Sequence, residues 1–242
     1  MAKRSSDGTV VTVRPVPFSD VDAALLVVKN RGKTKNGDPI IGVYYGGTGQ
    51  LVLNLTPAKE TWAELPYGVD RRLSGKFIKS DLAINGAAGE EYEKLCMTVN
   101  LSEEAAKLLR ELDAKACEQL RAFMPDVKWN DAVKDGADTN PPRFNPKLIV
   151  ACRQPELLTK FHVRPFEQPV AHGAGVSFLK PLLDANGNFW QAKAKVAVRL
   201  NKIWVNGDKA GITWQVTELV ADLQEKQAVV YEEAFGDDVF DQ

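Results

Sequence analysis

The sequence predicts a mainly β protein, either a barrel or a sandwich, with one long helix. Short runs of β-branched and other apolar residues alternate with turn residues along most of the 242-residue chain. The clearest β pattern is a hairpin, in which residues 193–204 and 210–220 flank an Asn-Gly-Asp turn. One segment, residues 102–123, carries the apolar spacing of a long helix. We therefore expect this helix to pack on a sheet.

The other expected strands precede the final hairpin and are separated by turn residues. They are residues 9–13, 24–28, 40–45, 51–55, 76–84, 94–101, 148–152 and 158–164. The basic, turn-rich segment 29–38 joins two of them, which predicts an N-terminal hairpin within residues 9–45 that has a long basic tip. Residues 65–69 are expected to form a turn. Residues 129–145 have neither a helical nor a strand period, and a loop of this length is often functional or mobile.

The helix prediction rests on a cap and an apolar stripe. Ser102 is a good N-cap, and Glu103 and Glu104 stand in the first turn, where the helix dipole favours anions. The apolar stripe consists of Ala105, Leu108, Leu109, Leu112, Ala116, Leu120 and Phe123. Pro125 ends the helix.

Composition allows a folded core and shows an uneven distribution of charge. Hydrophobic residues make up 44% of the chain and charged residues 26%, as in ordinary globular proteins. The net charge is −1, from 31 bases and 32 acids. Residues 232–242 hold five of these acids and no base, so the rest has 31 bases against 27 acids, or +4. We therefore expect one domain over residues 1–230 and a flexible acidic and aromatic tail over residues 231–242.

The chemistry-bearing residues indicate a protein without a catalytic site, metal or cofactor. The three cysteines form no Cys-x-x-Cys pair, which argues against a disulfide framework and a zinc site and favours a reducing compartment. The familiar nucleotide, hydrolase and metalloprotease motifs are absent from the sequence. His162 and His172 are possible bases, but no nucleophile accompanies them. Because no apolar run reaches membrane-spanning length, we expect a soluble, intracellular protein.

Two predicted strands place basic residues on one face. In residues 193–204, Val196, Val198 and Leu200 alternate with the basic residues Lys193, Lys195 and Arg199. The segment 158–164 repeats this pattern with Lys160, His162 and Arg164. Such faces are able to hold a nucleic-acid backbone. The alternative is a solvated sheet face, on which Lys and Arg are ordinary.

Aromatic residues near bases are candidates for stacking on nucleobases. We select three rings expected in loops, Tyr67, Phe144 and Trp190, because Arg71, Arg72, Arg143 and Lys193 lie near them in the sequence. For each ring the alternative is packing in the protein. Trp214 shares its strand face with Ile212 and Val216, which predicts a core position, whereas Trp204 fits either environment.

The tail combines acids with aromatic residues. The residues expected to bind a partner are Glu232, Glu233, Phe235, Asp237, Asp238, Phe240 and Asp241. Such a segment is able to occupy the protein's own basic groove or a basic patch on a partner, with the aromatic rings as apolar anchors. The alternative is a tail that only solubilises the protein.

The order of these parts resembles the phage-type single-stranded DNA-binding proteins of short-tailed phages and their relatives in large DNA viruses. The matching stretches are the strand and helix of residues 96–120, the hairpin of residues 192–220 and the tail. Residues 9–45 have no counterpart in this pattern, and the tail is shorter and less acidic than the family's strongest examples. The resemblance implies an OB-fold-like β-barrel crossed by the helix, with binding of single-stranded DNA in replication, recombination or repair.

The sequence therefore leads to a functional hypothesis with two rivals. The hypothesis is a non-catalytic protein that coats single-stranded DNA without sequence specificity, with the choice between DNA and RNA left open. Its tail would cover the groove until DNA displaces it, then recruit polymerase, helicase or primase, and tail exchange would allow a homodimer. The first rival is a virion or scaffold protein with a β-barrel and an assembly tail. The second is an enzyme with an unrecognised site around His162.

Overall fold

The computed structural model describes the central part of the chain with several gaps. The described residues are 2–4, 10–12, 14–33, 37, 39–46, 49–60, 62–67, 69–73, 93–135, 140–148, 159–164, 189 and 191–222. The predicted strand 76–84, most of the predicted strand 148–152, Trp190 and the tail 231–242 lie outside them. No helix in the described ranges is both long enough and apolar enough to cross a membrane.

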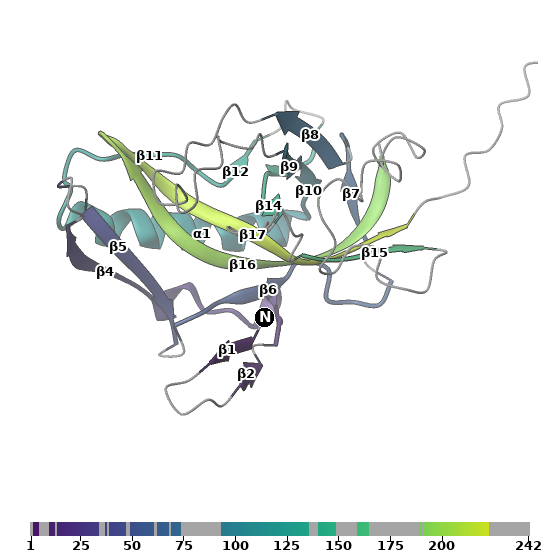
Figure 1. Ribbon diagram of the computed structural model, residues 1–242, viewed down its shortest axis with the longest axis horizontal. Helices are drawn as coiled ribbons and strands as arrows, with labels where there is room; N and C mark the ends of the chain where they lie inside the picture. The colour runs from purple at the N-terminus through teal and green to yellow at the C-terminus, as the bar shows by residue number, and fades with distance from the viewer. Residues whose placement is uncertain are drawn as a thin grey trace, which may run out of the picture.

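The longest strands form the predicted C-terminal hairpin. β16 (Ala192–Asn206) and β17 (Lys209–Asp222) pair in antiparallel register from Lys193↔Asp222 to Asn206↔Lys209. Figure 1 shows them as the long curled ribbon through the molecule. The turn uses Gly207 at φ +59°, a backbone conformation that glycine adopts without strain.

Side chains alternate along β16 as predicted until a bulge changes the pattern. Val196, Val198 and Leu200 are buried, and Trp214 of β17 is in the core at 3% exposure, which confirms those predictions. The register shifts between Leu200 and Lys202, so Ile203 is buried and Trp204 pairs with Gly211. A bulge adds one residue to one strand and thereby reverses which side chains face the core.

Short strands attach to both edges of the long hairpin and make the sheet curl into a barrel-like circuit. They are β6 (Val52–Asn54), β7 (Ala63–Leu65), β9 (Glu93–Met97), β10 (Val99–Asn100) and β14 (Lys147–Leu148). β16 pairs with β7, β7 with β10, β9 with β14, and β14 with β17. Because only Thr98 separates β9 from β10, these pairings return to their starting point. This curled sheet with one helix is consistent with the OB-like class that the sequence predicts.

The remaining strands extend the sheet or form separate pairs. They are β3 (Val16–Pro17), β8 (Val69–Leu73), β11 (Lys128–Trp129), β12 (Val133–Lys134), β13 (Arg143–Phe144) and β15 (Lys160–Arg164) in the main sheet, and β1 (Ala2–Arg4) with β2 (Val10–Thr12). β11, β12 and β13 lie within or at the edge of the predicted loop 129–145. A two-residue strand has no detectable period, so these three strands could not be predicted from the sequence pattern.

The helix occurs where the sequence predicts it. α1 spans Glu103–Arg121, and the side chain of Ser102 accepts a hydrogen bond from the Ala105 N–H at 3.2 Å. Leu109, Leu112 and Leu120 are fully buried on its inner face. Phe123 lies beyond the helix end and is 38% exposed, so its inclusion in the buried stripe was wrong.

Two strands in the N-terminal part of the chain pair with each other and are hydrogen-bonded to the helix. After two short 3₁₀ turns (Phe18–Asp20 and Ala23–Leu25), β4 (Leu26–Lys33) pairs in antiparallel register with β5 (Pro39–Tyr45). The carboxamide of Gln119 on α1 donates to the Leu26 carbonyl and accepts from the Val28 N–H, both at 2.8 Å. This one carboxamide thus forms the two kinds of hydrogen bond, to a carbonyl and from an N–H, that a neighbouring strand would form with β4. The predicted strand 9–13 belongs instead to the β1–β2 pair.

A buried carboxylate ties α1 to the segment that leads into β12. Asp113 is 2% exposed and accepts a hydrogen bond from the Ala132 N–H at 2.6 Å. Burial raises the pKa of Asp113 to about 7, and the negative charge of Asp131 adds to this effect. The Ala132 N–H, the Trp129 side chain and Lys134 act in the opposite direction. The folded state therefore holds a proton on Asp113 that the unfolded state releases at lower pH.

Substitution of Asp113 tests this assignment. With a folded-state pKa of about 7, against an ordinary value of 3.8, Asp113 lowers the free energy of unfolding as pH rises between these values. Asp113→Asn removes that loss, so the variant should gain stability relative to wild type by up to about 1.4 kcal/mol per pH unit. Urea unfolding of both proteins at several pH values measures the difference. A difference that does not change with pH contradicts the raised pKa.

Candidate nucleic-acid interface

A row of polar side chains crosses five strands on one side of the sheet. We call this side the outer face, opposite the buried Ala194, Val99 and Phe144. The register pairs are Lys193↔Glu64, Glu64↔Asn100, Asn100↔Arg143 and Arg143↔Lys134. Residues that are directly paired point to the same face of a sheet, so these side chains share the outer face. β17 extends the row with Asp222, which pairs with Lys193.

Trp62 and Lys195 form the first contact between a ring and a cation on the outer face. The Lys195 ammonium lies 5.1 Å from the centroid of the Trp62 ring. It also donates hydrogen bonds to the backbone carbonyls of Ala58 (3.1 Å) and Lys59 (2.5 Å). Lys195 therefore holds the loop after β6 and one face of the indole in place. A cation–π contact of this kind contributes about 0.5–1 kcal/mol at an exposed site.

Tyr67 and Arg143 form a second such contact beside the polar row. The Arg143 guanidinium lies 5.3 Å from the centroid of the Tyr67 ring, which is 53% exposed. In the same row the Asn100 amide donates to Glu64 at 2.7 Å. Tyr67 and Arg143, both candidates from the sequence, are therefore brought together, with the ring open to solvent.

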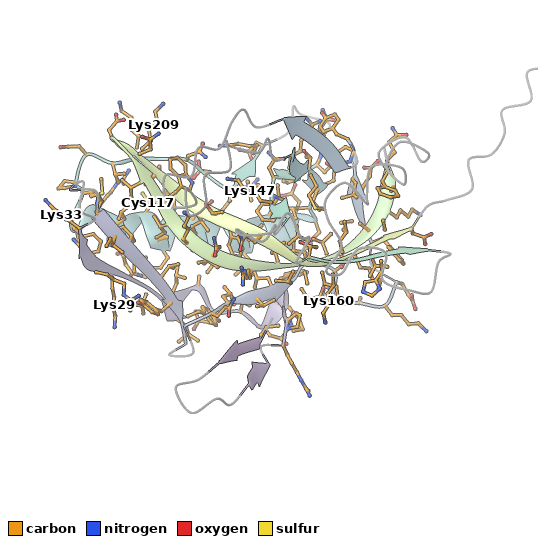
Figure 2. The ribbon with its side chains drawn as sticks, viewed as in Figure 1. Lys29, Lys33, Cys117, Lys147, Lys160 and Lys209 are labelled. Atoms are coloured by element: carbon orange, nitrogen blue, oxygen red, sulfur yellow. The ribbon has the colours of Figure 1, made fainter. Side chains whose placement is uncertain are left out.

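The β4–β5 hairpin carries a third cluster, centred on Tyr44. The cations of Lys29 and Arg31 lie 5.7 Å and 5.6 Å from its ring centroid. A Cβ atom on Gly42 would come within 2.8 Å of the Tyr44 hydroxyl and 2.9 Å of the Arg31 side chain. The tyrosine ring therefore covers the glycine. Figure 2 shows Lys29 on this hairpin, well separated from Lys160 along the long axis of the molecule.

The basic residues predicted on β15 and β16 share one face, but β17 lies between them and adds acids. Register aligns Lys195, Val220 and His162 in one row. In the next rows Lys160 pairs with Glu218 and Arg164 with Asp222. His162 Nε2 lies 3.7 Å from the Glu218 carboxylate. This part of the face is therefore a mixture of charges rather than a continuous basic groove.

The Arg199 side chain forms hydrogen bonds within the sheet. Its Nε and Nη2 both donate to Gln215 Oε1, at 2.9 Å and 2.7 Å, on the paired strand. The side chain is half-buried, and desolvation lowers the pKa of the guanidinium. These contacts give Arg199 a role in joining β16 to β17.

The position of Phe144 shows that its predicted role as a stacking ring is wrong. We expected it to be a stacking ring in a loop, but it is 1% exposed and packs edge-on against Trp214, with centroids 6.1 Å apart. In the two-residue strand β13, Arg143 faces outward and Phe144 inward, because neighbouring strand residues alternate. Of the other candidates, Arg71 and Arg72 are described only as backbone positions in β8, while Trp190 and the tail residues lie outside the described residues.

Two residues of the outer face were not among the selected candidates. Trp62 is not one of the three selected rings; it stands two positions before Glu64 and therefore lies on the same side of the strand. Lys134 lies in the segment predicted to be a loop, where no strand pattern assigns its side chain to a face. Among the described residues, no three His, Cys, Asp or Glu side chains are grouped so that they could hold a metal ion.

Comparison with known proteins gives structural similarities at low sequence identity, of which two are described. No family model and no curated protein matches the sequence. The chain is similar to the single-stranded DNA-binding protein from bacteriophage Enc34 in complex with ssDNA, with 12% identity and a TM-score of 0.38, over 81% of this chain and 96% of that chain. The chain is also similar to the C-terminal truncation of the same phage protein, with 12% identity and a TM-score of 0.39, over 82% of this chain and 96% of that chain. At these values neither similarity decides the function, which is argued from the side chains described above.

The burial of Phe144 has a measurable consequence. Phe144→Ala should lower the free energy of unfolding by about 3–5 kcal/mol, because it leaves a cavity against Trp214. Chemical denaturation measures this loss. Tyr67→Ala is the matched comparison, since an exposed ring contributes little to packing, and its loss should be far smaller. Equal losses in the two variants would contradict these placements.

Proposed function

We propose that this chain is a non-catalytic protein that binds single-stranded DNA with little dependence on sequence. The observation that carries the proposal is the pair of aromatic–cation contacts on the outer face, Trp62 with Lys195 and Tyr67 with Arg143. Every nucleobase has a flat face that stacks on such rings, so binding of this kind tolerates all sequences. A duplex keeps its bases stacked inside and does not offer them to exposed rings.

The polar row supplies cations for the phosphates beside these rings. Lys134 and Lys193 are exposed at the two ends of its five-strand part, and Arg143 lies between them. Four strand spacings of about 4.8 Å separate β16 from β12, so this part is about 19 Å long. That length accommodates several nucleotides. Glu64 and Asp222 limit the positive charge, which favours moderate affinity through stacking over a purely electrostatic attraction.

Titration of a fluorescent single-stranded oligonucleotide tests the proposal. Wild type should bind the single strand more tightly than a duplex, and affinity should fall with salt with a log–log slope of about −2 for three phosphate contacts. Trp62→Ala and Tyr67→Ala should each weaken binding by about 1–3 kcal/mol. An RNA oligonucleotide of the same sequence measures the preference between DNA and RNA.

Phe123→Ala is the matched control, because this ring is exposed at the end of α1, outside the outer face. It should leave affinity unchanged. If the wild-type protein shows no preference for the single strand even at low salt, the proposal fails. The alternative of a virion or scaffold protein is then favoured, and a large defined oligomer measured by light scattering would support it.

We further propose that the tail regulates this surface and recruits partners in replication, recombination or repair. Five acids and three aromatic rings within residues 231–242, against a body of net charge +4, support this part. The tail would compete with DNA for the basic residues and, once displaced, would dock polymerase, helicase or primase. Exchange of tails between two chains would give a homodimer.

Removal of the tail should tighten DNA binding at low salt. A chain that ends at residue 230 is compared with full-length protein in which the five acids are replaced by their amides (Glu232→Gln, Glu233→Gln, Asp237→Asn, Asp238→Asn and Asp241→Asn). Both should bind more tightly than wild type, and the gain should shrink as salt screens the attraction. Unchanged affinity in both variants would contradict competition by the tail.

A further inference from the structure

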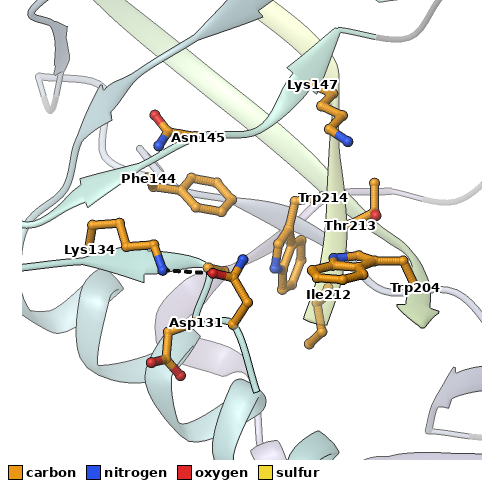
Figure 3. Close-up of a pocket in the computed structure, with 11 residues that line it drawn as sticks. Asp131, Lys134, Phe144, Asn145, Lys147, Trp204, Ile212, Thr213 and Trp214 are labelled. Atoms are coloured by element: carbon orange, nitrogen blue, oxygen red, sulfur yellow. Dashed lines mark hydrogen bonds between the residues drawn. The ribbon is translucent and has the colours of Figure 1, made fainter. Parts of the chain in front are cut away.

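A pocket lies where the edge of β17 has a gap in its strand pairing. On this edge β11 pairs with Lys209 and Ala210, and β14 pairs with Gln215 and Val216. Between them, the described residues provide no strand partner for residues 211–214 on this edge. A pocket of about 250 Å³ occupies the gap and is bordered by the segment 130–134. Figure 3 shows the loop residues on one side and the two indoles of Trp204 and Trp214 on the other.

Trp214 presents an unused hydrogen-bond donor to this pocket. Its side chain lines the pocket and is 3% exposed, and its indole Nε1 is buried with no partner among the described residues. A buried N–H without an acceptor is unfavourable, and most such groups in folded proteins are paired. An atom of a ligand in the pocket is able to supply that acceptor.

Trp204 forms a wall of the pocket, and its position depends on Gly211. The two residues are a register pair, and Trp204 is half-buried. A Cβ atom on Gly211 would lie 2.7 Å from the Asn130 carbonyl oxygen and 3.1 Å from two atoms of the Trp204 ring. Only glycine therefore allows the indole and the 130–134 segment to approach the strand this closely. The result is an aromatic surface held in place before any ligand binds.

Hydrogen-bond acceptors and positively charged side chains complete the lining of the pocket. Asp131 and the amide side chains of Asn130 and Asn145 supply acceptors, and Lys134 and Lys147 supply positive charge. Lys134 donates to Asn130 Oδ1 at 3.2 Å. Lys134 also ends the polar row of the outer face, so a strand bound along that row reaches the mouth of the pocket.

The volume of the pocket and its hydrogen-bonding groups restrict the class of ligand that fits it. Pockets for drug-sized ligands are larger, about 300–1,000 Å³, so this one suits a single small ring. The Trp214 N–H requires an acceptor. Asp131 is exposed, and the amide oxygens of Asn130 and Asn145 accept from Lys134 at 3.2 Å and from Thr98 at 2.8 Å. Each of these oxygens is still able to accept a hydrogen bond from a ligand, because a carboxylate or amide oxygen accepts more than one. The imide edge of thymine or uracil offers a carbonyl oxygen next to an N–H, whereas cytosine has an acceptor at the position of that N–H.

We infer that this pocket takes one thymine or uracil base turned out of the bound strand, with a base carbonyl accepting from Trp214 Nε1 and the ring packed against Trp204. The inference rests on the proposed function. It adds a preference at one nucleotide to an interface that otherwise ignores sequence. Lys134 and Lys147 then lie beside the phosphates that flank this nucleotide.

Competition between dT and dC oligonucleotides of equal length tests the inference. Wild type should prefer dT by about tenfold, the value of one well-placed hydrogen bond. Trp214→Phe removes the donor while keeping an aromatic ring, and it should reduce the preference to near unity with affinity for dC unchanged. Because Trp214 is in the core, Trp204→Leu provides a second variant at a half-buried position, and it too should remove the preference.

Trp62→Ala is the matched control, because it should weaken binding of dT and dC equally and keep their ratio. If wild type binds both strands with equal affinity, the inference is wrong while the proposed function stands. If dT is preferred and folded Trp204→Leu retains the full preference, the pocket is not its source and the inference is again wrong. If neither strand binds, the proposed function itself fails.

Discussion

The fold depends on the ladder between β16 and β17. Among the described strands, those of this hairpin are the longest. The strands of two to five residues in the main sheet join its two edges, either directly or through another short strand. A two-residue strand has almost no stability of its own. The register of the hairpin therefore sets where β7, β14 and β15 attach, and through them where the side chains of the outer face meet.

Both parts of the candidate interface arise from this ladder. Pairing of β7 with the start of β16 brings Trp62 beside Lys195, and continuation through β10 to β13 brings Arg143 beside Tyr67. The pocket lies on the opposite edge, where the described residues provide no strand partner for residues 211–214. The bulge near Lys202 then turns Trp204 toward that uncovered stretch instead of into the core. One strand pair thus determines the positions of both the aromatic–cation contacts and the pocket.

The helix supports this arrangement through polar contacts of two partly or fully buried side chains. Gln119 binds the backbone of β4, and Asp113 binds the Ala132 N–H in the segment that borders the pocket. Both contacts use side chains of α1 to bind backbone groups that have no strand partner at those positions among the described residues. The segment that borders the pocket is therefore held by a buried carboxyl group, and burial raises the pKa of this group to about 7.

The sequence by itself determined the features that depend on local periodicity. These are the capped helix at residues 103–121, the Asn-Gly hairpin and the alternation of Val196, Val198 and Leu200 with basic residues. Tertiary structure decided which distant residues meet. Phe144 is buried because β13 joins the sheet, Trp62 reaches Lys195 across 133 positions of sequence, and acids of β17 separate the two basic strands. Strand pairing between remote segments leaves no periodic trace in either segment, and for that physical reason the interface could be seen only in three dimensions.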